Sequence, residues 1–254
     1  MIEKKESKIS KKDAFLVGVI FGDLNYDKVS EHIEELELLA ETAGARVIHS
    51  YTQKLNKINP SFFIGPGKAQ QIIEHAKSLN VKLVIFDDEL SPAQIKNFSK
   101  LSKSIAVIDR STLILEIFSQ HAKTKEAKTQ VELAQLEYML PRLTRAWTHL
   151  ERQMGGIGAR AGAGETQIEV DRRLVRARIS NLKKELVKID TERETQRKKR
   201  KENYKIALAG YTNAGKSTLM KALSGSDVFI QNQLFATLDT TIRSVQIDKT
   251  HNIL

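Results

Sequence analysis

The residues best suited to chemistry in this sequence lie at positions 210–218, in the stretch GYTNAGKST. The stretch matches the pattern G-x-x-x-x-G-K-[ST], and it stands between an apolar run and a helix-like run. Its glycines allow the backbone to wrap around a cluster of oxygens, with the amides of residues 213–217 pointing inward at the α- and β-phosphates of a nucleotide. Lys216 supplies positive charge to the β- and γ-phosphates, and the Ser217 hydroxyl is the expected Mg²⁺ ligand. The predicted nucleotide-binding residues are Gly210, Asn213, Ala214, Gly215, Lys216, Ser217 and Thr218.

A second glycine-rich stretch, GGIGARAGAGET, occupies positions 155–166. It satisfies the dinucleotide pattern G-x-G-x-x-[GA], but we reject that interpretation because charged helix-like sequence flanks it and no strand precedes it. Such a dense run of glycines interrupts a helix, and with arginines nearby it is suited to bring bare backbone and guanidinium groups close to RNA. A flexible connector with incidental arginines is the alternative. The predicted RNA-binding residues are Arg152, Gly155, Gly156, Gly158, Arg160, Arg172 and Arg173.

Other clusters of polar residues carry weaker signals. The stretch FFIGPGKAQQ at 62–71 is too short for a phosphate loop and is interpreted as a tight turn between a strand and a helix. The acidic run at 87–89 either binds a metal or, as we prefer, places negative charge at a helix N-terminus. The six histidines show no metal-ligand spacing, and no pair of a nucleophile and a base stands out.

The charge of the chain is unevenly distributed. Of a formal net charge of +10, residues 141–200 carry sixteen Lys and Arg against eight Asp and Glu. This asymmetry indicates a polyanionic partner, with nucleic acid favoured over an anionic membrane surface. Cysteine is absent, which excludes disulfides and Cys-ligated metal sites. No apolar run resembles a signal peptide or a membrane span, so we expect the cytoplasm as the location.

Residues 13–110 are predicted to form an α/β domain. Short β-branched or aromatic runs indicate strands at 15–21, 45–51, 62–65, 81–88 and 105–109, and amphipathic runs between them indicate helices. One of these helices is expected to end at Gly44, and another to begin at Ser91 with Pro92 in its first turn. Strands that alternate with helices imply a mostly parallel sheet.

Two further segments follow. Residues 111–200 are expected to form an antiparallel helical hairpin, with one long helical stretch before the glycine-rich tip and a second after it, because leucines and isoleucines recur three and four residues apart. Residues 204–254 begin with a predicted buried strand at 204–210, continue into the phosphate loop and a helix, and contain strands near 240–248 and 252–254. The predicted fold class is therefore α/β, with a helical hairpin and, at 204–254, the start of a P-loop domain.

The motifs together resemble the HflX family of ribosome-associated GTPases, in the Obg–HflX group of translation-factor-class P-loop proteins. The resemblance is carried by FIGPGKAQQI, VIFDDELSPAQ, IDRSTLILEIFSQHAKTKEAKTQVELAQLEYMLPRL, GGIGARAGAGETQIEVDRR and GYTNAGKSTL. The run at 109–143 and the glycine-rich stretch are the most specific, since few other families combine them with a phosphate loop.

This resemblance implies a factor that binds GTP, contacts ribosomal RNA of the large ribosomal subunit, and splits or rescues stalled ribosomes, with no transmembrane segment and as a monomer. It implies that Lys216 and Thr237 are catalytic, with Thr237, in FATLDTT, as the switch threonine that meets Mg²⁺ and the γ-phosphate, and Thr240 as the less favoured alternative. Asn213 is similar to the loop asparagine that supports a K⁺ ion in related cation-dependent GTPases.

The sequence departs from the family pattern after the phosphate loop. Neither D-x-x-G, which holds the second switch, nor N-K-x-D, which reads guanine, follows Ser217. We therefore expect a C-terminally truncated GTPase that is not hydrolytically competent alone, and guanine selectivity stays undecided. A non-catalytic module that binds RNA or ribosomes, complete at this length, is the second hypothesis. An ATP-using P-loop protein is the third, and the switch-like FATLDTT argues against it.

Overall fold

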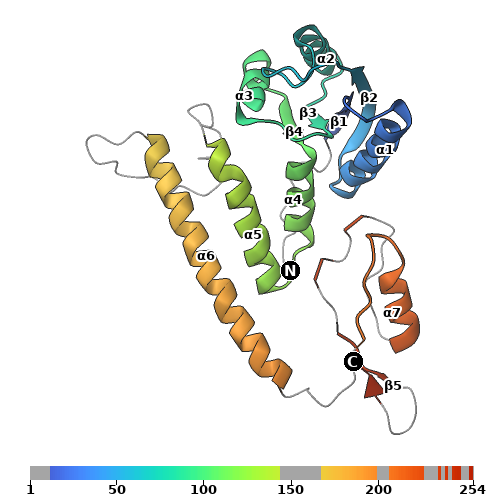
Figure 1. Ribbon diagram of the computed structural model, residues 1–254, viewed down its shortest axis with the longest axis vertical. Helices are drawn as coiled ribbons and strands as arrows, with labels where there is room; N and C mark the ends of the chain where they lie inside the picture. The colour runs from blue at the N-terminus through green and yellow to red at the C-terminus, as the bar shows by residue number, and fades with distance from the viewer. Residues whose placement is uncertain are drawn as a thin grey trace.

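The computed structural model describes residues 12–143, 167–198, 206–225, 234–235, 238–239, 242–246 and 252–253. A parallel sheet with helices on both faces occupies the upper part of Figure 1, and two long helices extend from it. The α/β fold class is confirmed. Within the described ranges, no helix combines the length and apolarity that crossing a bilayer requires.

The sheet consists of β1 (Asp13–Ile20), β2 (Arg46–Lys54), β3 (Leu83–Phe86) and β4 (Ala106–Asp109). Its strand order is β2-β1-β3-β4, and all neighbouring pairs are parallel, as the alternation of strands and helices predicts.

The strand predicted at 62–65 is wrong. Phe63 has a positive φ of 67° and makes only an isolated bridge to Asn59. The Asn59 side chain accepts hydrogen bonds from the backbone amides of Ser61 and Phe62, and this bonding closes a turn. The run is apolar because it packs against the core next to Phe98 and Phe86, and not because it pairs with other strands.

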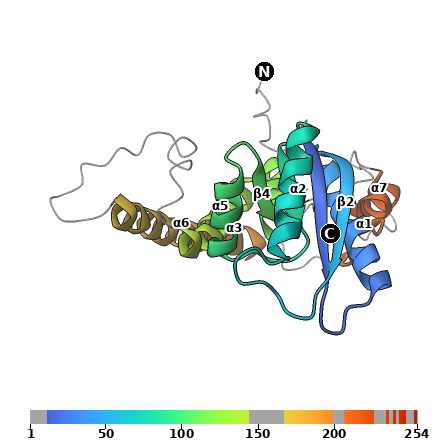
Figure 2. The same cartoon turned by 90° about the horizontal axis from the view of Figure 1, so that it is seen from above.

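Alternate residues along the strands serve two separate cores. One core lies beneath α1 (Tyr26–Thr42) and α4 (Arg110–His121), and the other beneath α2 (Pro66–Ser78) and α3 (Pro92–Leu101). Figure 2 shows α1 and α2 on opposite sides of the strands. Both predicted helix boundaries are confirmed, because α1 ends just before Gly44 with its φ of 84°, and Ser91 caps α3 through a capping box.

The helical stretch predicted before the glycine-rich tip is interrupted. It consists of α4 and α5 (Lys125–Met139), followed by a short 3₁₀ turn at Leu140–Arg142. The break lies at residues 122–124, where the Thr124 side chain accepts a hydrogen bond from the Ala127 amide and starts a new helix. Helix α4 packs on the sheet, so Leu113 and Ile117 are fully buried among strand residues.

Helix α6 (Gln167–Lys198) runs antiparallel to α5. The predicted seam is present, with Leu136 and Leu143 packed against Val175, Ile179 and Leu182. Ion pairs border the seam, among them Lys125–Glu185 at 2.9 Å and Glu132–Arg178 at 2.7 Å. The antiparallel pairing of two helices predicted from the heptad-like spacing is confirmed.

The strand predicted at 204–210 is wrong for its described part. Residues 206–210 form no strand, and Ile206 is 62% exposed. A buried strand needs pairing partners, but β5 (Val245–Gln246) and β6 (Asn252–Ile253) pair with each other and run antiparallel. The predicted helix after the loop is α7 (Lys216–Ser224), none of whose residues is buried.

Candidate nucleotide-binding site

The loop before α7 contains two residues with a left-handed backbone conformation. Asn213 has a φ of 58° and Gly215, the residue preceding the first turn of α7, a φ of 83°. Residues with side chains rarely adopt the second of these conformations, so a substitution of Gly215 is strained even though a Cβ there would meet nothing within 4 Å. The two left-handed residues turn the chain sharply into the helix.

Lys216 folds back over the loop that precedes it. Its Nζ donates hydrogen bonds to the carbonyl oxygens of Gly210 at 2.8 Å and Tyr211 at 2.5 Å. The first amides of a helix have no partner four residues earlier within the helix, and the helix dipole attracts anions to that end. The ammonium group and the N-terminus of α7 together form a positively polarised site, with Ser217 half-buried in the first turn and Thr218 exposed.

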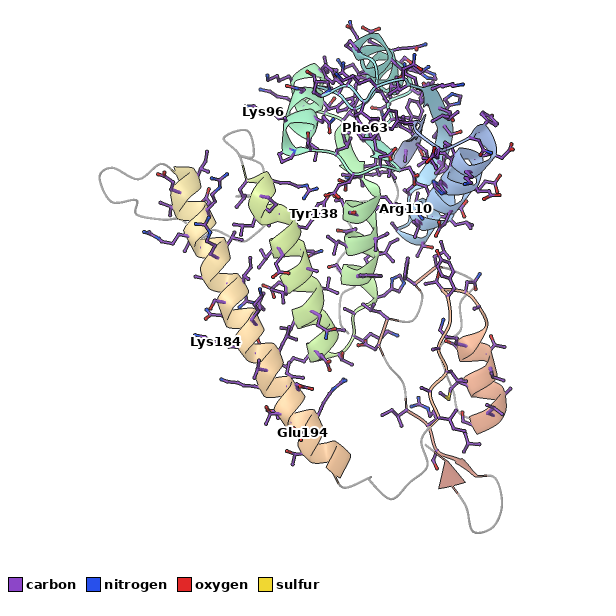
Figure 3. All side chains as sticks on the ribbon, in the orientation of Figure 1. Phe63, Lys96, Arg110, Tyr138, Lys184 and Glu194 are labelled. Atoms are coloured by element: carbon purple, nitrogen blue, oxygen red, sulfur yellow. The ribbon has the colours of Figure 1, made fainter. Side chains whose placement is uncertain are left out.

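The loop is tied to the N-terminal sheet domain by a contact that the sequence did not predict. The Tyr211 hydroxyl donates to Glu35 Oε1 at 2.7 Å, and Glu35 also pairs with Arg110, which lies at the start of α4 beside α1 (Figure 3). Arg110 in turn donates to Asp87 at 2.7 Å. Burial raises the pKa of Glu35, but the hydrogen bonds from Tyr211 and Arg110 outweigh it and leave the pKa below its usual value.

Two carboxylates of the acidic run at 87–89 pair with arginines, and the first turn of α3 itself contains no acidic residue. Asp87 lies 3.3 Å from His32 in addition to its bond with Arg110, and Glu89 pairs with Arg142. In the part of the chain that the structure describes, no group of three or more acidic or histidine side chains has a metal-binding arrangement.

The Asp88 carboxyl makes the stability of the fold depend on pH. Burial, assisted by the charge of Asp87, raises the pKa of its carboxyl from 3.8 to about 6, against the opposing effect of His32. The folded chain therefore keeps a proton that the unfolded chain releases, and the stability from this group falls as the pH rises from about 4 to about 6.

Asp88→Asn is expected to raise the midpoint of urea unfolding at about pH 7.5 and to leave it nearly unchanged at about pH 4, because asparagine stays neutral. The exposed Asp23→Asn is the matched control and should change neither midpoint. An equal rise in the urea midpoint of Asp88→Asn at both pH values would contradict the raised pKa of the Asp88 carboxyl.

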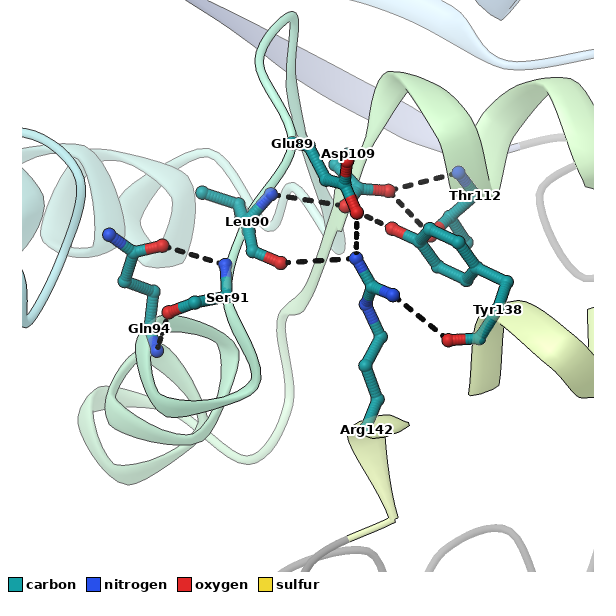
Figure 4. A network of polar contacts seen from close by, with 8 residues as sticks. All are labelled: Glu89, Leu90, Ser91, Gln94, Asp109, Thr112, Tyr138 and Arg142. Atoms are coloured by element: carbon teal, nitrogen blue, oxygen red, sulfur yellow. Dashed lines mark hydrogen bonds and ion pairs between the residues drawn. The ribbon is translucent and has the colours of Figure 1, made fainter. Parts of the chain in front are cut away.

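A buried carboxylate joins the sheet to the hairpin (Figure 4). Asp109, at the end of β4, is fully buried and accepts hydrogen bonds from the Leu90 amide at 3.1 Å and the Tyr138 hydroxyl. It also accepts from both the amide and the hydroxyl of Thr112, at 2.9 Å and 2.6 Å. Burial raises the pKa of Tyr138, and the hydrogen bond to Asp109 adds to that effect. The network sets the orientation of α5 against the sheet.

The predicted RNA-binding residues are only partly placed. Arg152, Gly155, Gly156, Gly158 and Arg160 lie outside the described residues, as does the predicted switch residue Thr237. Arg172 donates to the Leu143 carbonyl at 2.8 Å and so helps to close the hairpin, and Arg173 is exposed next to it.

Three family models match the chain in succession. They are described as GTP-binding GTPase N-terminal (residues 30–119), GTP-binding GTPase Middle Region (121–200) and 50S ribosome-binding GTPase (205–254).

Curated relatives and solved structures agree with these models. A protein named GTPase HflX from Flavobacterium psychrophilum is 49% identical over 247 residues, which is 97% of this chain and 59% of that protein. GTPase HflX of Escherichia coli K12 is 45% identical over 92% of this chain and 54% of its own length. The chain thus spans a little more than half the length of these relatives.

Two solved structures resemble the chain. The crystal structure of SsGBP with GDP has a TM-score of 0.54 and 29% identity, covering 95% of this chain and 60% of that one. A GTP-binding protein of the archaeon Sulfolobus solfataricus, also with GDP, has a TM-score of 0.52 and 26% identity over 95% of this chain and 58% of its own.

Proposed function

Because this chain belongs to the HflX family of GTPases, we propose that it is part of a factor that binds and hydrolyses GTP, associates with the large ribosomal subunit and splits or rescues stalled ribosomes. It acts in the cytoplasm as a monomer. The observation that carries the proposal is the backbone at residues 213–216, where two left-handed residues lead into α7. This conformation directs backbone amides and the helix N-terminus toward one anion.

In this proposal each residue of the loop has a separate task. Lys216 neutralises the β- and γ-phosphates, and the hydroxyls of Ser217 and Thr237 hold Mg²⁺. Asn213 supports a K⁺ ion beside the phosphates. When bound, these ions would supply charge that offsets the charge developing on the transferred phosphoryl group.

The loop at 210–218 serves the phosphates of the nucleotide rather than its base. The sequence contains no N-K-x-D motif to read guanine and no D-x-x-G motif to position the attacking water. We therefore propose that residues 1–254 bind nucleotide through its phosphates and hydrolyse it slowly or not at all. The same absence favours a second candidate, in which these residues act on ribosomes as a binding module without turnover.

The proposed contact with ribosomal RNA rests on α6 and the glycine-rich stretch before it. Helix α6 carries ten Lys and Arg against six Asp and Glu, and its apolar seam already faces α5. Arg176, Lys183 and Lys184 line a shallow hollow on this helix. Cationic side chains contact the phosphates of RNA and thereby release counterions. The surface is suited to RNA rather than to a membrane, which would require an exposed apolar face.

Arg160→Glu combined with Arg173→Glu is expected to weaken the pelleting of the chain with purified large ribosomal subunits and to flatten its salt dependence. Each lost phosphate contact should reduce the slope of log affinity against log salt concentration by roughly one unit. Arg172 is left in place because it closes the hairpin. The matched control is Lys82→Glu with Lys103→Glu, an equal change of charge at exposed positions of the sheet domain, outside the proposed RNA surface. Equal weakening in both double variants would contradict a specific role for the tip.

A further inference from the structure

Residues that flank the proposed switch threonine, Thr237, contact the break between α4 and α5. We call residues 122–124, with the first turn of α5, the elbow. Asp239 Oδ2 accepts hydrogen bonds from the backbone amides of Lys123 at 2.9 Å and Thr124 at 3.1 Å, and its Oδ1 accepts from the Thr124 hydroxyl at 2.5 Å. Three donors from two successive residues converge on one carboxylate.

These bonds extend the cap of α5. The Thr124 oxygen that donates to Asp239 accepts at the same time from the Ala127 amide at 3.1 Å. The Asp239 charge therefore lies at the positive end of the helix dipole, where an anion is favoured. Partial burial would raise the pKa of Asp239, but the hydrogen bonds from Thr124 and Lys123 outweigh it and hold the pKa below its usual range.

Apolar contacts hold the same segment. Leu238 packs against a small cluster of Ala122, Ala127 and Val131 on the elbow. The Phe235 ring meets the Phe118 ring edge to face, with centroids 5.0 Å apart. Leu234 is buried in the core beneath α1 and α4. Residues on both sides of Thr237 are thus anchored to the N-terminal half of the chain.

The phosphate loop is anchored at the opposite end of α4. Tyr211 is linked through Glu35 to Arg110, the first residue of α4, whereas Asp239 binds just beyond its last residue. The twelve residues of α4 span about 18 Å at 1.5 Å per residue. Both views place α7 apart from α5 (Figures 1 and 2).

We propose that the elbow is a docking surface for the residues that flank the proposed switch threonine, and that Asp239 is the positioning residue of this contact. This inference rests on the proposed function. Because the phosphate loop and Asp239 are held at opposite ends of α4, a triphosphate that recruits Thr237 would draw Asp239 off the elbow, so nucleotide and elbow would compete for this segment. The competition is reciprocal. A partner that moves the hairpin changes the affinity for the triphosphate by the same factor by which the triphosphate changes the affinity for that partner.

Hydrogen exchange of the whole chain, without nucleotide, tests the docking. Asp239→Asn keeps the shape of the side chain but removes its charge, and it is expected to speed exchange of the amides at 123–128 about fivefold, the effect of losing one ordinary helix cap. Thr124→Ser should keep the wild-type rate and Thr124→Val should not. The control Asp190→Asn, on an exposed part of α6, should change nothing. Unchanged exchange at 123–128 in Asp239→Asn would overturn the docking.

Addition of nucleotide tests the competition. A non-hydrolysable GTP analogue with Mg²⁺ is expected to speed exchange at 123–128 in the wild type, whereas GDP is not. The analogue should bind Asp239→Asn about fivefold more tightly than the wild type, with GDP affinity unchanged. An analogue that binds without either effect overturns the competition and leaves the proposed function standing. Failure of the wild type to bind any nucleotide overturns the proposed function and the competition together, while the nucleotide-free comparison still decides the docking.

Discussion

Lys216→Ala is expected to reduce nucleotide affinity a hundredfold or more, roughly the value of two strong charge-assisted hydrogen bonds. The Lys216 ammonium already lies over the loop through its bonds to the Gly210 and Tyr211 carbonyl oxygens, so little rearrangement is needed to reach a phosphate. Titration with a fluorescent GTP analogue measures the loss.

A matched control is Lys221→Ala, in the last turn of the same helix, where the helix dipole repels rather than attracts an anion. We expect it to leave nucleotide affinity within about twofold of the wild type. Affinity of Lys216→Ala for large ribosomal subunits should also be unchanged. Equal losses of nucleotide and ribosome binding would contradict the division of labour between the loop and the hairpin.

Asp109→Ala is expected to destabilise the fold by roughly 3–5 kcal/mol, because it leaves several buried donors without their acceptor. Those donors belong to Leu90, Thr112 and Tyr138, so the substitution affects the segment before α3 and the helices α4 and α5 together. The free energy of unfolding in urea, followed by circular dichroism, measures the effect.

Two further variants show whether the effect of Asp109→Ala exceeds that of losing one hydrogen bond or one exposed carboxylate. Tyr138→Phe removes one donor and should cost about 1 kcal/mol. The exposed Asp190→Ala, on α6, should stay within about 0.5 kcal/mol of the wild type. If Asp109→Ala is no more destabilising than Tyr138→Phe, the network in Figure 4 does not fasten the hairpin to the sheet.

Local patterns in the sequence predicted most of the N-terminal domain. A run such as LVIF at β3 is buried at every position, as expected for a central parallel strand. The Ser91–Pro92 start of α3 follows from side-chain capping, which acts within three residues. The strand predictions at 62–65 and 204–210 are wrong for a shared reason. Hydrophobicity indicates burial or β-propensity, but strand pairing depends on which neighbouring strands the fold supplies.

The candidate site was predicted only where it is contiguous in sequence. The loop at 210–218 is recognisable because phosphate binding requires its residues at fixed spacing. The contacts that place the loop and Asp239 join residues far apart, 176 positions for Glu35 and Tyr211 and 115 for Thr124 and Asp239. No periodicity encodes such pairs, and both Glu35 and Thr124 resemble ordinary residues of amphipathic helices.

The most direct test of the nucleotide site is an equilibrium titration of the folded wild-type chain with a fluorescent GTP analogue in the presence of Mg²⁺, followed by competition with unlabelled GTP, GDP and ATP. We predict saturable binding that requires Lys216 and that all three nucleotides displace, because residues 210–218 hold phosphates and residues 1–254 lack the N-K-x-D motif that reads guanine. Absence of saturable binding, or binding that survives Lys216→Ala unchanged, would contradict the assignment of this loop as the nucleotide site.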